Sequence, residues 1–301
     1  PANESSDAED RVIELAVDHA FNAGSIVVAA GGNEGSGQVD VPSAYPHVLS
    51  VAATDASDLR ASFSNFGDFV DLAAPGDSVI TTAPRSLCAS GYQVASGTSF
   101  SAPAVSGAVA LVDHVRPGLT VSQRFELVRR SARDVGTPGF DVGTGLGVLD
   151  VSNALSGPVP VGDGYEVDDD VYWITGRFAK SHRALLRRTR RSGRATGRVS
   201  GFNDPTDVYR VELRKGDSLK ATLTGAAGSR FALGIWSPRT RGLDITENRT
   251  RGRLLAYRDK PGAGERLTAR KVATSGSYYV SVEAPHPDRA DTTYVLTVRR
   301  G

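Results

Sequence analysis

Two short runs of uninterrupted apolar residues constrain the fold of this chain more than any other feature. One covers Ser25-Ile26-Val27-Val28-Ala29-Ala30, and the other extends from Val48 to Ala53. Runs of this length that are rich in β-branched residues are typical of strands buried on both faces of a parallel sheet. Before the first run, Ser6-Asp7-Ala8-Glu9 fits a capping box, and apolar residues then recur at helical spacing until Gly24. The pattern predicts an amphipathic helix followed by a buried strand.

The alternation of helices and buried strands continues to about residue 155. Strands are expected at Phe69–Leu72 and Ser78–Thr81, on either side of Ala74-Pro75-Gly76. A helix of small residues is expected from about Ser99 to Val115, and Thr120-Val121-Ser122-Gln123 opens another helix. These elements predict an α/β layer fold for the first half of the chain.

The pattern changes at a stretch rich in proline and glycine, from Leu155 to Gly164. We interpret residues 157–164 as a linker between a first domain, 1–156, and a second domain, 165–301. Beyond the linker, apolar and polar residues alternate, which predicts an antiparallel β-sandwich. The alternating positions are Tyr209/Val211/Leu213, Leu219/Ala221/Leu223, Phe231/Leu233/Ile235, Tyr278/Val280/Val282 and Tyr294/Leu296/Val298.

Composition excludes several classes of protein. A hydrophobic content of 40% is enough for a packed core, and no apolar run reaches the ~20 residues that a membrane-spanning helix needs. The 35 basic and 34 acidic residues leave a net charge of +1, so no global charge favours nucleic acid or anionic lipid as a partner. The chain begins with Pro1 and has no methionine, so we expect a processed form or a fragment.

The single cysteine, Cys88, cannot form a disulfide within this chain. We expect a buried free thiol. The alternative is a disulfide with a cysteine outside these residues.

The string Gly97-Thr98-Ser99-Phe100-Ser101-Ala102-Pro103 places a serine at the start of the small-residue helix. Unpaired N–H groups and the helix dipole favour developing negative charge there, so Ser99 is a candidate nucleophile. The alternative is an N-cap serine, which is common at helix starts. Gly-x-Ser-x-Gly is absent because position 101 is serine, so an α/β-hydrolase elbow is not supported.

A second string, Ala29-Ala30-Gly31-Gly32-Asn33-Glu34-Gly35, places an amide side chain in a glycine-rich turn after the first buried strand. An amide at the carboxyl edge of a sheet is able to donate a hydrogen bond to an oxyanion. The alternative is a turn asparagine in a left-handed conformation.

Together and in this order, the motifs resemble the subtilisin-like serine proteases, the subtilase family. The resemblance implies that residues 1–156 form part of a three-layer domain with a parallel sheet and act on protein or peptide substrates. It also implies that Ser99 is the acylating nucleophile, and that Asn33 and the backbone N–H of Ser99 form the oxyanion hole. The matching segments are Val27–Gly35, Tyr45–Val51, Ala61–Gly67, Ala74–Gly76, Gly97–Pro103 and Gly145–Asp150.

The aspartate and histidine motifs of the family, which precede the asparagine in the chain, do not occur here. None of the five histidines (His19, His47, His114, His182 and His286) is followed by Gly-Thr, and each is interpreted as structural or exposed. We therefore expect a chain that begins after those motifs, is inactive alone, and has the preceding part of the catalytic domain as a partner. The alternative is a processed chain or pseudoprotease that acts as a binding module through its β-sandwich.

The resemblance also suggests a substrate pocket. It places Ala30-Gly31-Gly32 in the pocket wall, Thr98 among the substrate-binding residues and Asp40 near the base. A carboxylate at the base would favour lysine or arginine on the acyl side of the cut. The alternative for Asp40 is a solvated loop aspartate.

No organic cofactor is implied, but a weak cation site is. Asp71, with the carbonyl groups of Ser43, Tyr45 and Val48, resembles a site of oxygen ligands that suits Ca²⁺ or Na⁺.

The second half of the chain resembles the bacterial pre-peptidase C-terminal domain, a small β-sandwich appended to secreted peptidases. Asp163–Asp170, Asp204–Asp217 and Gly276–Val282 carry this resemblance, which implies an extracellular location. Acidic residues in these segments either bind Ca²⁺ or form solvated turns. The candidate ligands are Glu166, Asp168, Asp169, Asp204 and Asp207.

A run from Arg177 to Arg198 contains nine basic residues and no acidic one. It predicts contact with a polyanion or a cell surface, a site of autolysis, or a flexible solvated insertion.

Overall fold

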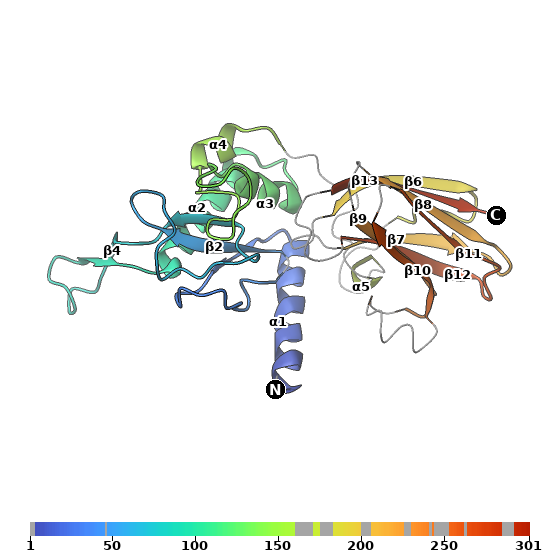
Figure 1. Cartoon of the computed structure of the whole chain (residues 1–301), viewed down its shortest axis with the longest axis horizontal. Helices are drawn as coiled ribbons and strands as arrows, with labels where there is room; N and C mark the ends of the chain where they lie inside the picture. Colours follow the sequence, from blue (N-terminus) through green and yellow to red (C-terminus); the bar gives the residue numbers. More distant parts are fainter. Residues whose placement is uncertain are drawn as a thin grey trace. The chain divides into compact units, whose positions relative to one another are not determined.

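The structure is a computed structural model, and the chain divides into two compact units, Pro1–Gly162 and Asp163–Gly301 (Figure 1). The division lies within the stretch interpreted above as a linker. The structure describes residues 4–45, 47–159, 171–174, 183–199, 206–225, 230–240, 243, 253–261, 264–284 and 292–301. The calcium candidates Glu166, Asp168, Asp169 and Asp204 lie outside the described residues.

The first unit contains a parallel sheet with the strand order β1-β2-β3. Val27 of β1 pairs with Val48, and Val51 of β2 pairs with Leu72 of β3. All seven residues of β2 are buried, as the second apolar run predicts. The elements of this unit are α1 (Glu4–Asn22), β1 (Val27–Ala30), β2 (Val48–Thr54), β3 (Leu72–Pro75), β4 (Val79–Thr82), β5 (Tyr92–Ala95), α2 (Thr98–Val115), α3 (Val121–Arg130) and α4 (Val151–Ser156).

Helix α2 packs against all three strands of the parallel sheet, and its buried residues include Val105, Ala108 and Val112. Helix α1 packs against β1 and β2, where Val17 joins a cluster with Val48. The prediction of a mixed α/β unit with a parallel sheet is therefore confirmed.

Two helix starts test the capping predictions. Helix α3 begins as expected, because Thr120 and Gln123 form a reciprocal capping box with two hydrogen bonds of 3.1 Å. Helix α1 begins earlier than expected, at Glu4, so Ser6 lies inside the helix and is not its cap.

The second unit contains two four-stranded antiparallel sheets, with orders β10-β9-β12-β7 and β11-β8-β13-β6. Side chains from both sheets form one hydrophobic core, which includes all fifteen of the alternating positions predicted from the sequence. The elements are α5 (Val171–Ile174), β6 (Ser192–Val199), β7 (Thr206–Leu213), β8 (Leu219–Gly225), β9 (Arg230–Trp236), β10 (Leu254–Pro261), β11 (Gly264–Ala269), β12 (Gly276–Glu283) and β13 (Thr292–Arg300).

The end of the arginine-rich run is a strand, so the interpretation of the whole run as a flexible insertion is wrong. Residues 192–199 form β6, which pairs with β13. Ala195, Gly197 and Val199 are buried, whereas Arg194 and Thr196 are exposed and Arg198 is half-buried. The inward side chains are small, which hid the alternation in the sequence.

Among the described residues, no helix is long and apolar enough to cross a membrane.

Candidate functional site

The candidate site lies at the carboxyl edge of the parallel sheet. Gly31 follows β1 and donates its N–H to Val51 O at 2.9 Å. Gly76 follows β3 and accepts a hydrogen bond of 2.8 Å from Gly97 N–H, just before α2. These backbone bonds bring the turn after β1, the turn after β3 and the start of α2 to one edge, where ligands of open α/β sheets commonly bind.

Ser99 lies in the first turn of α2 and is exposed. The N-cap of the helix is Gly97 and no side chain caps it, so the alternative interpretation of Ser99 as an N-cap is wrong. Within the described part of the chain, neither the hydroxyl nor the N–H of Ser99 forms a hydrogen bond. Both groups are therefore available at the end of the helix where the dipole stabilises negative charge.

Asn33 is held against the start of α2 by Thr98. Its Oδ1 accepts hydrogen bonds from the Thr98 N–H at 2.8 Å and from the Thr98 hydroxyl at 2.9 Å. Thr98 is fully buried, so its position is fixed by packing. Because Oδ1 is occupied, the Nδ2 amide is the end of the side chain that remains to donate to a ligand.

Ser101 has a different environment from Ser99. It is fully buried, and its hydroxyl donates to Ala74 O at 2.9 Å, which connects α2 to β3. A Cβ atom at Gly76 would lie 2.2 Å from Ser101 Oγ and 2.6 Å from Ala53 Cβ. Only glycine fits at position 76, so the Ala74-Pro75-Gly76 motif supports the start of the helix.

Asp40 lies beside Gly32, and its place at the base of a substrate pocket stays a prediction. A Cβ atom at Gly32 would lie 2.7 Å from Asp40 Oδ2. The carboxylate accepts hydrogen bonds from Asn65 Nδ2 at 3.3 Å and from Gln38 Nε2 at 3.1 Å. It is half-buried and has neutral partners among these contacts.

Asn65 organises the turn that carries Asn33, and the sequence analysis did not single it out. It is fully buried, and its Oδ1 accepts the N–H groups of Glu34 at 2.9 Å and Ser36 at 3.2 Å. The signal was present in the Ala61–Gly67 motif, which the sequence analysis used only as part of the family resemblance.

The described histidines lie away from Ser99. His47 is buried, its Nδ1 lies 3.0 Å from Asp18 Oδ1, and its ring stacks on Phe21. It precedes β2, whose seven residues extend about 23 Å to the carboxyl edge. His114 is fifteen residues beyond Ser99 on α2, or about 22 Å along the helix. His19 lies in the last turn of α1, which leads into the amino end of β1.

The carboxylate of Asp71 already has partners. Its Oδ2 accepts the N–H of Ser50 at 2.9 Å, and Arg129 Nη1 lies 3.9 Å from Oδ1. The carbonyl of Tyr45 accepts the N–H of Val48 at 3.3 Å. In the part of the chain that the structure describes, no three His, Cys, Asp or Glu side chains form a metal-binding group. The cation site at Asp71 and Ser43 stays a prediction.

Cys88 is a free thiol, but it is partly exposed, so the expectation of a buried thiol is wrong. It lies between β4 and β5, a short antiparallel hairpin that leaves its connection open to solvent. Its Sγ lies 3.2 Å from Ser90 Oγ and 2.8 Å from Tyr92 O. The hydrogen bond from the Ser90 side chain lowers the pKa of Cys88 below its usual value.

Comparisons with known proteins find similarity to one family in the first unit. Residues 2–147 match the model of the subtilase family. The chain is 38% identical over 141 residues to subtilisin Savinase of Lederbergia lenta, an alignment that covers 47% of this chain and 51% of the relative. It is 38% identical over 132 residues to a thermophilic serine proteinase of Bacillus sp. (strain AK1), covering 44% of this chain and 32% of that relative.

The chain thus spans about half the length, or less, of these curated relatives. A crystal structure of a lanthipeptide protease aligns with a TM-score of 0.47 and 27% identity, covering 51% of this chain and 57% of that one. The similarity of the first half of the chain to subtilisin-like proteases is confirmed.

Proposed function

We propose that this chain carries the nucleophile and the oxyanion hole of a subtilisin-like serine endopeptidase. One observation carries the proposal: within the described residues, the hydroxyl and the N–H of Ser99 have no hydrogen-bond partner at the start of α2, beside an asparagine whose amide is oriented by Thr98. The match of residues 2–147 to the subtilase family supports the same assignment.

In the proposed reaction, Ser99 Oγ attacks the carbonyl carbon of a peptide bond while a base removes its proton. Asn33 Nδ2 and the Ser99 N–H donate to the oxyanion of the tetrahedral intermediate, and the dipole of α2 adds to the stabilisation. The protonated base then gives its proton to the leaving amine, which leaves an acyl group on Ser99. Water, deprotonated by the same base, releases the acyl group as a carboxylic acid.

The base is proposed to come from outside residues 1–301. His19, His47 and His114 do not contact Ser99, and His47 is already paired with Asp18. Without a base the hydroxyl of a serine is a weak nucleophile, so the chain alone is expected to be inactive.

The substrate is proposed to be a protein or peptide with lysine or arginine on the acyl side of the cut. Asp40 supports this preference, because its carboxylate lies beside Gly32 and contacts only amide groups in the described structure. The second unit is proposed to be a β-sandwich accessory domain of a secreted enzyme, supported by its two sheets that share one core.

Reaction with a fluorophosphonate tests the assignment, because this probe modifies activated serines. We expect the protein from its natural source to be labelled on Ser99, and the 301-residue chain alone to react far more slowly. Ser99→Ala should abolish labelling. Ser106→Ala, which removes another exposed serine of α2, should leave it unchanged.

Labelling at a serine other than Ser99 would refute the assignment. A native species of 31.7 kDa that is not labelled would also contradict the proposal and would favour a non-catalytic binding chain.

A further inference from the structure

The near-zero net charge of the chain conceals a strong separation of charge between its units. Residues 163–301 contain 27 Lys and Arg against 16 Asp and Glu, whereas residues 1–162 contain 8 against 18. Of the 27 basic residues, 22 are arginine. A planar guanidinium binds sulfate, phosphate and carboxylate groups through paired N–H bonds, which an ammonium group does not. The second unit therefore has the charge and the donors of an anion-binding domain.

Part of this charge lines two adjoining hollows, which share Arg183, Ala184 and Arg187. The first hollow, of about 230 Å³, is also lined by Arg190 and Arg194, and no acidic residue is among its described lining residues. The second, of about 590 Å³, is also lined by Arg188, Arg210 and Glu212. We call these two hollows together the arginine groove.

The arginines of the groove have few acidic neighbours among the residues that the structure describes. There, no carboxylate pairs with the side chain of Arg183, Arg187, Arg190 or Arg194. Glu212, the one carboxylate among the described lining residues, accepts the backbone N–H of Arg188 at 3.3 Å. The buried Nε of Arg210 also has no hydrogen-bond partner among the described residues. A bound anion would relieve the mutual repulsion of these charges and provide their missing acceptors.

The backbone that carries the arginines is fixed before any ligand binds. Leu185 N–H donates to Arg210 O, and Glu212 N–H donates to Leu186 O, both at 2.8 Å, so the segment lies along β7. Leu185 and Leu186 are buried in the core of the unit.

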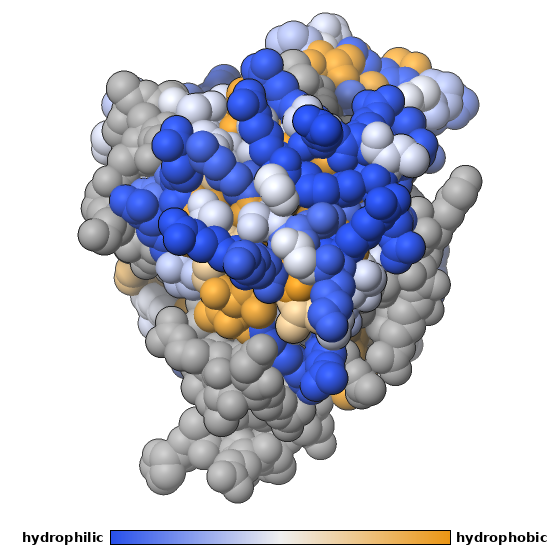
Figure 2. Space-filling view, turned by 90° about the vertical axis from the view of Figure 1, so that its right-hand side faces the viewer, coloured by the Kyte–Doolittle hydropathy of each residue, from blue (hydrophilic) through white to orange (hydrophobic). Residues whose placement is uncertain are grey.

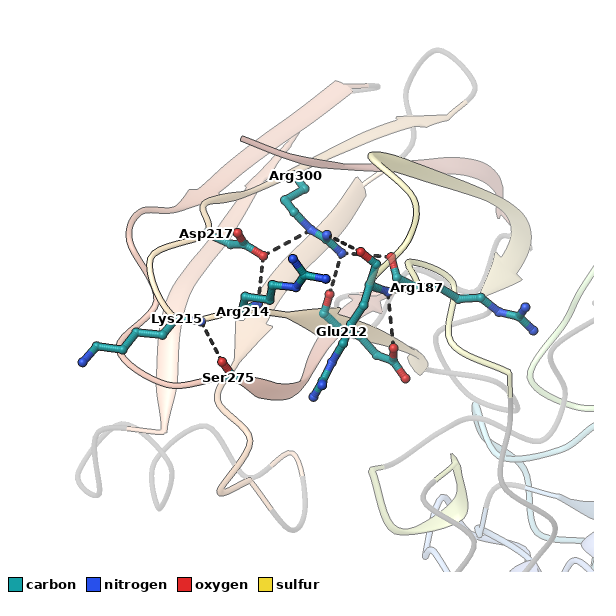
Figure 3. A network of polar contacts seen from close by, with 8 residues as sticks. Arg187, Glu212, Arg214, Lys215, Asp217, Ser275 and Arg300 are labelled. Carbon is teal, nitrogen blue, oxygen red and sulfur yellow. Dashed lines mark hydrogen bonds and ion pairs between the residues drawn. The ribbon is translucent and has the colours of Figure 1, made fainter.

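Arg300, near the end of β13, holds the turn between this segment and β6. Its guanidinium donates to Arg188 O at 2.7 Å and to the carbonyls of Arg187 and Glu212 at 2.9 Å (Figure 3). Its Nε lies 3.2 Å from Asp217 Oδ2, whose carboxylate also accepts the Arg214 N–H at 2.8 Å (Figure 3). An anchored turn lowers the conformational entropy that binding would otherwise cost.

The character of the surface restricts the ligand. No aromatic residue is among the described residues that line the groove, so these residues offer no platform on which nucleic acid bases stack. Ala184 and Leu185, the apolar side chains of this described lining, are buried, which is unlike the apolar centre of a protein–protein interface. Figure 2 views the second unit from the side on which Figure 1 marks the C-terminus, and hydrophilic side chains dominate this face. Such a surface recognises charge alone.

We propose that the arginine groove binds a single strand of an acidic polysaccharide through its sulfate or carboxylate groups. This inference is independent of Ser99 and of the proposed protease activity.

Fluorescence anisotropy with an end-labelled heparin dodecasaccharide tests the proposal on the full 301-residue chain. The test variant combines Arg187→Gln, Arg190→Gln and Arg194→Gln. The control combines Arg239→Gln, Arg266→Gln and Arg270→Gln, which removes the same charge. Arg266 lies on β11, at the opposite edge of the sheet from β6.

We expect the test variant to bind the heparin dodecasaccharide about 10- to 100-fold more weakly at 0.15 M NaCl. The slope of log Kd against log salt concentration should decrease by about 2, since binding releases ~0.7 fewer counterions for each of the three contacts that is lost. The control should change Kd less than about threefold. Equal losses in the two variants would refute the groove as the site. Tighter binding of duplex DNA, polyphosphate or anionic vesicles than of heparin would refute the polysaccharide as its ligand.

Discussion

Replacing Tyr294 with phenylalanine should destabilise the second unit without opening a cavity. Tyr294 of β13 donates its hydroxyl to Oδ2 of Asp207 on β7 and lies 2.6 Å from the hydroxyl of Tyr209. Asp207 is fully buried, and the two tyrosines are each 1% exposed. This cluster joins the two sheets and connects the strands that carry Arg210 and Arg300, so the shape of the arginine groove depends on it.

The magnitude follows from the burial of the carboxylate. A hydrogen bond to a charged group contributes about 1.5–3 kcal/mol, and a buried acceptor that loses its donor cannot turn to water instead. Tyr294→Phe removes the shorter of two tyrosine hydrogen bonds to Asp207, leaving that from the Tyr209 hydroxyl at 3.5 Å, and it also removes one partner of Tyr209, so we expect a loss of about 2–3 kcal/mol. For a unit of this size, about 2–4 °C of Tm is lost per kcal/mol, which predicts a decrease of about 5–10 °C.

Tryptophan fluorescence in urea is the suitable assay, because both tryptophans of the chain, Trp173 and Trp236, lie in the second unit. The control is Tyr257→Phe, which removes a hydrogen bond of 3.0 Å to Glu283 Oε2 at a part-buried site. We expect the control to cost less than about 1 kcal/mol, since water can replace the lost donor. A loss below about 0.5 kcal/mol for Tyr294→Phe would refute the view that this cluster stabilises the unit.

Three further variants test other contacts. Gly32→Ala should destabilise the first unit by about 2–4 kcal/mol, because φ at Gly32 is +106° and a Cβ would lie 2.2 Å from Asn65 Nδ2. Gly107→Ala, which has open space around it, should instead stabilise α2 by about 0.5–1 kcal/mol. Unfolding followed by helical circular dichroism at 222 nm measures both changes. Ser90→Ala should raise the pKa of Cys88, since it removes the hydrogen bond that lowers it, and an unchanged rate of alkylation by iodoacetamide at neutral pH would contradict this. Arg300→Lys keeps the charge but loses the paired donors that hold the turn, so heparin binding should weaken about threefold or more. The slope of log Kd against log salt should stay unchanged. A reduced slope would mean that Arg300 contacts the polymer directly.

The elements with a strong apolar signal were predictable from the sequence. The two apolar runs became β1 and β2, and five alternating segments became β7, β8, β9, β12 and β13. Strand β6 was not predicted, because its inward residues are only alanine, glycine and valine and they alternate with polar residues in an arginine-rich run. Gly197 has to be small, since a Cβ there would lie 2.3 Å from the hydroxyl of Tyr294. Packing against a residue 97 positions away decides the composition of this strand, and no local pattern records that.

The candidate site was predictable in its residues but not in its construction. Helix-start chemistry and the family resemblance selected Ser99 and Asn33. Neither showed that Thr98 fixes the amide of Asn33 or that Asn65 holds the turn behind it. These are contacts between residues 65 and 31 positions apart, made possible by the parallel sheet.

The separation of charge shows why the net charge of a whole chain is a poor guide to its partners. At physiological ionic strength the field of a charge is screened within about 8 Å, so the potential that a ligand meets in the arginine groove is set by the charges nearest to it and not by the net charge of the chain. Among the described lining residues, these nearest charges include four arginines that no described carboxylate pairs with and one carboxylate that already accepts a backbone hydrogen bond. A net charge of +1 therefore excludes a uniformly basic surface, while a chain of two oppositely charged units retains the capacity to bind a polyanion through one of them.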